Sequence, residues 1–69
     1  MIKNTKFEKL LKDNGISRQK YADALEMSVQ TVNAYIEGRI KPSGRVMNKT
    51  DKYFAKLGIK VDTFKIFYN

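Results

Sequence analysis

Two helix-like patterns stand almost end to end in the middle of this chain of 69 residues. The first opens after Ser17, and the second opens after Ser28 and stops near Gly38. Serine is a preferred residue just before a helix because its hydroxyl accepts a hydrogen bond from a free backbone N–H of the first turn, and glycine commonly ends a helix. With so few residues between them, the two helices must pack directly against each other. This pair constrains the fold more than any other feature of the sequence.

Three further helical segments are expected around this pair. They run from about Thr5 to Asp13, from Ser43 or Arg45 to Gly58, and from about Val61 to Phe67. Thr5 and Glu8 fit a capping box, in which each side chain satisfies a free backbone N–H at the helix start. No segment shows the sustained alternation of a strand, and no two segments resemble a hairpin. The sequence therefore predicts an all-α fold of five helices in a single domain over residues 1–69.

The expected core follows from the spacing of the apolar residues. In each of the first four segments they recur three and four positions apart, which gives the helix one apolar side. These positions are Phe7, Leu10 and Leu11; Tyr21, Ala22 and Leu25; Val29, Val32, Tyr35 and Ile36; and Val46, Thr50, Tyr53, Phe54 and Leu57.

The composition excludes several kinds of site. The chain has no cysteine for disulfides or thiolate metal sites, and no histidine, the commonest general base and metal ligand. Its acidic residues are scattered over different segments without recognisable pairing. No apolar run approaches the length of a membrane span. We therefore expect a cytoplasmic protein that has no catalytic residues, metal, cofactor or small-molecule substrate and does not contact a membrane.

The charge of the chain favours a polyanionic partner. Fourteen Lys and Arg against seven Asp and Glu give a net charge of +7. A basic domain of this size commonly binds nucleic acid, although lysines that merely keep a small domain soluble give the same composition. The excess is concentrated after the two-helix stretch, because six basic residues between Arg39 and Lys56 are opposed only by Asp51.

The third helix carries polar groups on the side opposite its apolar residues. Gln30, Asn33 and Ala34 fall on that side at about 100° of rotation per residue. In the major groove of DNA, Gln and Asn pair with the N6/N7 edge of adenine, and Ala contacts the thymine methyl group. Taken singly, either amide is more typical of a solvated helix surface than of a base contact.

Flanking residues suit the DNA backbone. Ser28, at the start of the third helix, is placed to bind a phosphate together with the free backbone N–H groups there. Arg18 and Gln19 open the second helix, and Arg39 and Lys41 follow the third. We expect these five residues to contact phosphates.

The pieces, taken in order, resemble a known family. The stretches from Arg18 to Leu25, from Met27 to Ser28 and from Val29 to Gly38 resemble the helix-turn-helix of the Cro/CI-type phage repressors, also called the xenobiotic-response-element family. The stretch from Arg39 to Ser43 resembles the basic loop after that family's recognition helix, and the stretch from Tyr53 to Phe64 resembles the join between its last two helices. The resemblance covers about Phe7 to Phe67.

This resemblance implies a λ-repressor-like fold and a transcriptional regulator in a bacterial host cell. The second helix would brace across the DNA backbone while the third enters the major groove of double-stranded DNA. One monomer would bury too little surface against an operator to read it, so a homodimer is expected. The residues that would lie at the base edges are Val29, Gln30, Thr31, Asn33 and Ala34.

Three departures from the family pattern bear on function. Glu26 stands at the turn where the family usually has glycine, so either a non-glycine residue tolerates an unfavourable backbone there or the turn differs slightly. Val29 occupies a place that is often polar. From Arg18 to Glu37 the formal charge is −1, two basic residues against three acidic ones, and the third helix has no Lys or Arg.

These departures keep a second function open, that of a modulator or antirepressor. Such a protein would bind a partner phage repressor through the same face of the second and third helices and alter its DNA binding. The chain ends with Ile66, Phe67 and Tyr68, more apolar surface than a short last helix needs. We expect this tail to contribute to a homodimer or to docking on a partner repressor.

Overall fold

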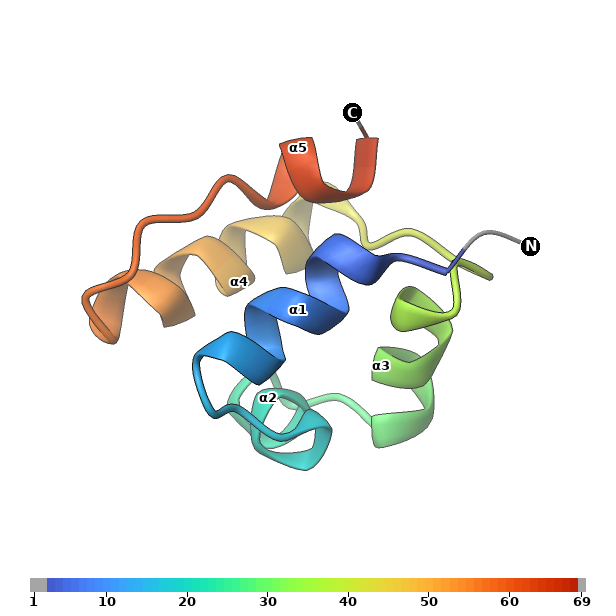
Figure 1. The fold of residues 1–69 in the computed structure, drawn as a ribbon, viewed down its shortest axis with the longest axis horizontal. Coiled ribbons are helices and arrows are strands. Elements are labelled where there is room, and N and C mark those ends of the chain that lie inside the picture. The colour runs from blue at the N-terminus through green and yellow to red at the C-terminus, as the bar shows by residue number, and fades with distance from the viewer. Residues whose placement is uncertain (1–2, 69) are drawn as a thin grey trace.

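The computed structural model describes residues 3–68, and in them five α-helices and no strand are found (Figure 1). The helices are α1 (Thr5–Asp13), α2 (Arg18–Ala24), α3 (Val29–Ile36), α4 (Gly44–Lys56) and α5 (Thr63–Tyr68). The prediction of an all-α fold with five helices is confirmed. The fifth helix begins two residues later than expected, at Thr63, whose backbone N–H and hydroxyl both donate to Asp51 of α4. None of the helices within these residues is both long and apolar enough to cross a membrane.

The helices surround one aromatic centre. Phe7 of α1 is fully buried, and its ring lies 5.2 Å from that of Tyr21 and 5.0 Å from that of Phe67, measured between centroids. Val32 and Ile36 of α3 and Phe54 of α4 belong to the same cluster. Buried aromatic rings remove large apolar areas from water and gain further from edge-on contacts. One side chain near the start of the chain therefore connects helices from its middle and its end.

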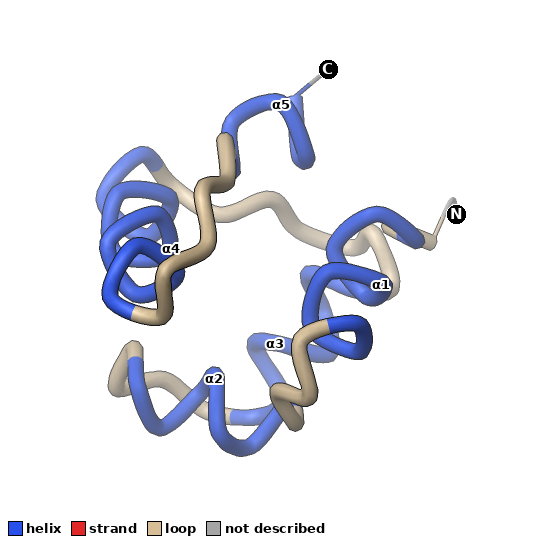
Figure 2. The backbone as a smooth tube through the Cα atoms, turned by 60° about the vertical axis from the view of Figure 1, so that its left-hand side comes forward, coloured by secondary structure: helices blue, strands red, loops and turns tan. Residues whose placement is uncertain are grey.

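Helices α2 and α3 lie together at one end of the molecule. In both ribbon and tube views they lie in the lower part of the molecule, and α5 lies at the top (Figures 1 and 2). Helix α3 also contacts α1, and α5 contacts α1 and α4. This arrangement leaves the outer side of the α2–α3 pair uncovered by the other helices.

The expected capping box at the first helix is wrong. The N-cap is Asn4, whose Oδ1 accepts a hydrogen bond from the backbone N–H of Phe7 at 3.0 Å. Asn4 also donates its backbone N–H to the carbonyl of Ile36 at 2.7 Å and its Nδ2 to the carbonyl of Ile66 at 3.3 Å. Glu8 instead forms ion pairs with basic side chains. Asn4 is preferred because it caps α1 and ties it to α3 and α5 at once.

The predicted core is largely confirmed, with one clear exception. Leu57 was expected on the apolar side of the fourth helix, but it is 47% exposed. Helix α4 ends at Lys56, and the chain then turns through Gly58, which has a positive φ of 78°. Ile59 packs against the core instead, and its N–H donates to the carbonyl of Phe54 at 2.9 Å. Ile59 therefore packs against the core where Leu57 was expected to do so.

The turn between α2 and α3 contains a strained residue. Glu26 has a φ of 57°, whereas every other described residue with positive φ is a glycine. The turn closes when the N–H of Met27 donates to the carbonyl of Ala22 at 2.9 Å. A side chain in this left-handed conformation brings its Cβ close to backbone atoms. The sequence-based expectation of an unfavourable backbone at Glu26 is confirmed.

A buried polar pair joins α2 to α4. The hydroxyl of Thr50 donates to the carbonyl of Val46 at 2.9 Å, so Tyr21 is the donor in the 2.6 Å bond between its hydroxyl and Thr50 Oγ1. Both side chains are almost fully buried. Burial raises the pKa of Tyr21 to about 12, because the phenolate would be poorly solvated.

We expect Glu26→Gly to stabilise the protein by about 1 kcal/mol, because glycine adopts a positive φ without steric cost. For a domain of this size that is a rise in Tm of about 4–8 °C. Thermal unfolding followed by circular dichroism measures it. The control is Glu26→Ala, which removes the carboxylate and keeps the Cβ, so it should leave Tm nearly unchanged. An equal rise in both variants would contradict backbone strain as the cause.

We expect stability to decline above pH 10 because of Tyr21. The raised pKa in the folded state means that the contribution of this group is complete below pH 10 and is lost as the pH rises from 10 through about 12. The fall in the free energy of unfolding, measured in urea, should be about 2–3 kcal/mol over that window. Tyr21→Phe keeps every other side chain, so it is the matched control, and its free energy of unfolding should fall less. Equally steep profiles would argue against a role for Tyr21.

Candidate nucleic-acid interface

Helix α3 begins at a well-formed cap. Ser28 is the N-cap, and its Oγ accepts a hydrogen bond from the backbone N–H of Thr31 at 3.2 Å. The same oxygen lies 3.0 Å from Thr31 Oγ1, so one of the two hydroxyls also donates a hydrogen bond to the other. Both Ser28 and its first-turn neighbour Gln30 are exposed. The start of α3, with its free backbone N–H groups, is therefore open to a phosphate.

The sides of α3 divide as the spacing predicts, apart from one position. Val32, Tyr35 and Ile36 are buried in the core, and Val29 packs against it while remaining partly exposed. Gln30 is exposed, and Asn33 and Thr31 are partly exposed. One side of the helix thus presents an exposed amide and a half-buried amide three residues apart.

Ala34 is not on the exposed side. Its side chain is only 6% exposed, so its predicted place beside the two amides is wrong. The chain turns back after α3 through Gly38, which has a φ of 77°. The N–H groups of Arg39 and Ile40 then donate to the carbonyl of Ala34 at 3.0 and 3.5 Å. A helical wheel shows only positions within one helix, and not what the rest of the chain places against them.

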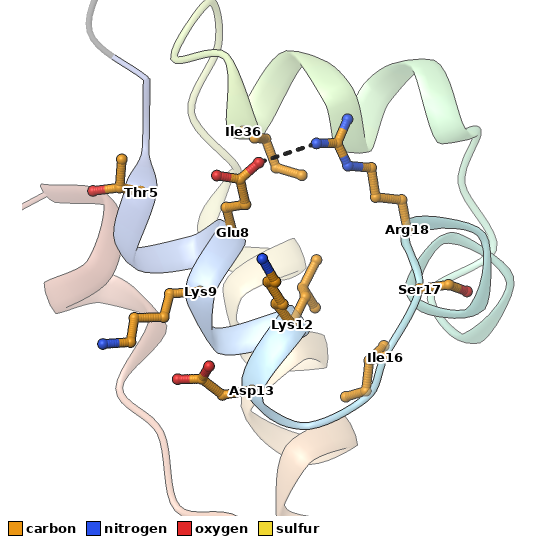
Figure 3. A pocket seen from close by; sticks show the side chains of 10 residues that line it. Thr5, Glu8, Lys9, Lys12, Asp13, Ile16, Ser17, Arg18 and Ile36 are labelled. Atoms are coloured by element: carbon orange, nitrogen blue, oxygen red, sulfur yellow. Dashed lines mark hydrogen bonds and ion pairs between the residues drawn. The ribbon is translucent and has the colours of Figure 1, made fainter.

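Arg18 of α2 connects α3 to α1. Its Nη1 donates to Asn33 Oδ1 at 2.7 Å, and its Nη2 donates to Glu8 Oε2 at 3.2 Å. Glu8 is also paired with Lys3 at 3.1 Å. Figure 3 shows the Glu8 and Arg18 side chains reaching toward each other from α1 and α2, across an open hollow of about 670 Å³. We name this set of Lys3, Glu8, Arg18 and Asn33 the Arg18 clasp.

The Arg18 clasp affects the ionisation of Glu8. The hydrogen bond from Lys3, with further attraction to Lys3 and Arg18, lowers the pKa of Glu8 below its usual value. Glu8 is therefore ionised throughout the neutral range and holds the guanidinium by charge. The sequence indicated Arg18 as a phosphate contact and Asn33 as a base contact, with no link between them. Their contact was missed because they are 15 residues apart and lie on different helices.

The chain can now be compared with known families. A helix-turn-helix family model of the Cro/CI type matches residues 7–62. The chain belongs to the Cro/CI-type helix-turn-helix family. This membership supports a DNA-binding regulator of transcription, in a family that typically has no enzymatic activity. Comparisons with curated proteins and with solved structures find no match.

Within this helix-turn-helix domain, the other expected phosphate contacts are on the surface and already have weak partners. Gln19 donates Nε2 to Asp23 Oδ1 at 2.7 Å, and the Nε of Arg39 donates to Glu37 at the same distance. Lys41 lies 4.9 Å from the centre of the Tyr68 ring. Exposed pairs of this kind contribute about 0–1 kcal/mol. They restrain the side chains without preventing exchange for a phosphate.

Basic residues of α4 also lie beside the turn that joins α2 to α3. Lys49, Lys52 and Lys56 of α4 are exposed and surround a hollow of about 230 Å³ beside Glu26. The hydroxyl of Tyr53, another lining residue, is buried and has no hydrogen-bond partner among the described residues. The basic excess seen in the sequence is therefore carried by α4 and by the loop before it, and not by α3.

The apolar tail of the helix-turn-helix domain mostly belongs to its own core. Phe67 is 6% exposed and its ring lies 5.9 Å from that of Tyr35. Ile66 packs against the same cluster. The expectation of surplus apolar surface is therefore wrong for Phe67. The exposed part is a stacked pair, in which Phe64 is 58% exposed and lies 5.2 Å from Tyr68.

Two substitutions in α5 should separate these roles. Phe67→Ala leaves a cavity beside Phe7, and we expect it to cost about 3–5 kcal/mol, a large share of the total stability of so small a domain. Phe64→Ala removes an exposed ring and should cost less than about 1 kcal/mol. Urea unfolding measures both. A cost for Phe64→Ala as large as that of Phe67→Ala would contradict this division of the tail.

Proposed function

We propose that this protein is a small phage-type regulator that binds operator DNA by placing α3 in the major groove. The observation that carries the proposal is the position of Gln30, exposed on the outer side of a capped helix whose opposite side is buried in the core. Asn33 lies one turn further along the same helix. An amide in this position can pair with a base edge without disturbing the core.

The remaining contacts follow from this orientation. Val29 and Thr31 lie beside the amides at the base edges, while Ala34 contributes packing, since its methyl group is buried. Phosphates would be bound by Ser28 with the free N–H groups of α3, by Arg18 and Gln19 at the start of α2, and by Arg39 and Lys41 in the loop after α3. These groups fix the register of the protein on the duplex.

Assembly and place of action form part of the same proposal. A helix of eight residues reads only a few base pairs, so two copies would bind two half-sites. The exposed Phe64–Tyr68 stack offers an apolar surface for a homodimer. The protein would act in the cytoplasm of a bacterial host, as part of a phage genetic switch.

One observation favours a second function. Helix α3 has no Lys or Arg, and residues 18–37 carry a formal charge of −1, whereas phosphate attraction supplies most non-specific affinity for DNA. A surface of this charge, with the half-buried Val29, also suits a basic partner. The protein would then modulate a phage repressor by binding it through the outer side of α2 and α3.

Binding to a randomised duplex library and to the neighbouring intergenic DNA tests the proposal. We expect enrichment of one sequence, and a loss of preference at a single base pair in Gln30→Ala, worth about 1–3 kcal/mol. Arg39→Ala is the control. It should weaken binding to all DNA sequences alike and reduce the slope of log affinity against log salt concentration by about 0.9. Binding that appears only when the neighbouring repressor is added would support the modulator instead.

A further inference from the structure

The Arg18 clasp fixes one orientation of the Asn33 amide. A guanidinium carries donors and no acceptor, so it binds the amide oxygen and rejects the amide nitrogen. With Arg18 Nη1 only 2.7 Å from Asn33 Oδ1, a flipped amide would place N–H groups against N–H groups. The fixed oxygen leaves Asn33 Nδ2 as the free end of the amide, and within residues 3–68 this nitrogen donates to no protein acceptor.

The clasp is held from a second side. Arg18 Nη2 donates to Glu8 of α1, and Glu8 is paired with Lys3. The guanidinium therefore spans two acceptors on different helices, an arrangement that restricts its rotation more than a single bond does. Neither end of the Arg18–Asn33 bond is buried, so the amide nitrogen remains accessible from outside.

The orientation matters because the four bases differ in their major-groove edges. Guanine presents two neighbouring acceptors, N7 and O6, whereas adenine presents the N7 acceptor beside the N6 donor. An asparagine that pairs bidentately with adenine must offer its oxygen to N6. In the clasp this oxygen is held toward Arg18 on α2 and has one lone pair occupied, so the group of the amide that is left without a partner is its donor nitrogen.

We propose, resting on the proposed function, that Arg18 is a positioning residue that turns Asn33 into a donor and makes the domain prefer guanine over adenine at the base pair facing Asn33. This replaces the adenine pairing that an unconstrained asparagine would favour. Specificity at this position thus depends on a residue of α2 as well as on the recognition helix.

The experiment selects duplexes from a randomised library with four versions of the full chain. Asn33→Ala first identifies the base pair that Asn33 faces, as the one position where preference relaxes. At that pair the wild type should favour guanine over adenine by about 10-fold or more. Arg18→Met should lose this preference or reverse it toward adenine. Lys20→Met removes the same charge from an exposed position of α2 and should keep the guanine preference.

A second measurement does not depend on DNA. The side-chain NH₂ of Asn33 should give a high heteronuclear NOE, typical of a rigid group, in the wild type and in Lys20→Met. In Arg18→Met this NOE should be lower, because the amide is more mobile. Circular dichroism checks that all variants are folded. If the library yields no preferred duplex, the proposed function fails and the base preference fails with it. If duplexes are selected but Arg18→Met keeps the guanine preference, or the wild type selects adenine there, this inference alone is overturned.

Discussion

The packing of Phe7 against Tyr21 and Phe67 is the interaction on which the rest of the fold depends. These rings come from α1, α2 and α5, so a single cluster holds together helices that are up to 60 residues apart. A chain of this size buries only about 60% of its unfolded surface, so it has no second core to compensate for losses in this one. The outer side of α3 is available for binding because the inner side is held by this cluster.

The helices could be predicted because their signals are local. Ser17, Ser28 and Ser43 cap the helices that follow them, and a glycine with positive φ stands two residues after the end of three helices. What the sequence did not reveal depends on the chain returning to itself. Asn4 caps α1 while bonding to α3 and α5, and Ala34 is buried although it lies on the polar side of its own helix. No periodic pattern contains such information, because it concerns residues outside the element being read.

The candidate site divides in the same way. The exposure of Gln30 followed from its place opposite Val32 and Tyr35, which is a property of one helix. The contact between Arg18 and Asn33 required the crossing angle of two helices and an anchor from a third. Helical spacing can therefore indicate which side chains face outward, while the orientation of an individual amide depends on a neighbour that spacing does not identify.

The left-handed conformation of Glu26 has a consequence for the lifetime of the protein in a cell. About 1 kcal/mol of unrelieved strain raises the unfolded fraction of a marginally stable chain about fivefold. Proteases act on that fraction, so the rate of degradation, and with it the steady-state abundance, is sensitive to this one residue.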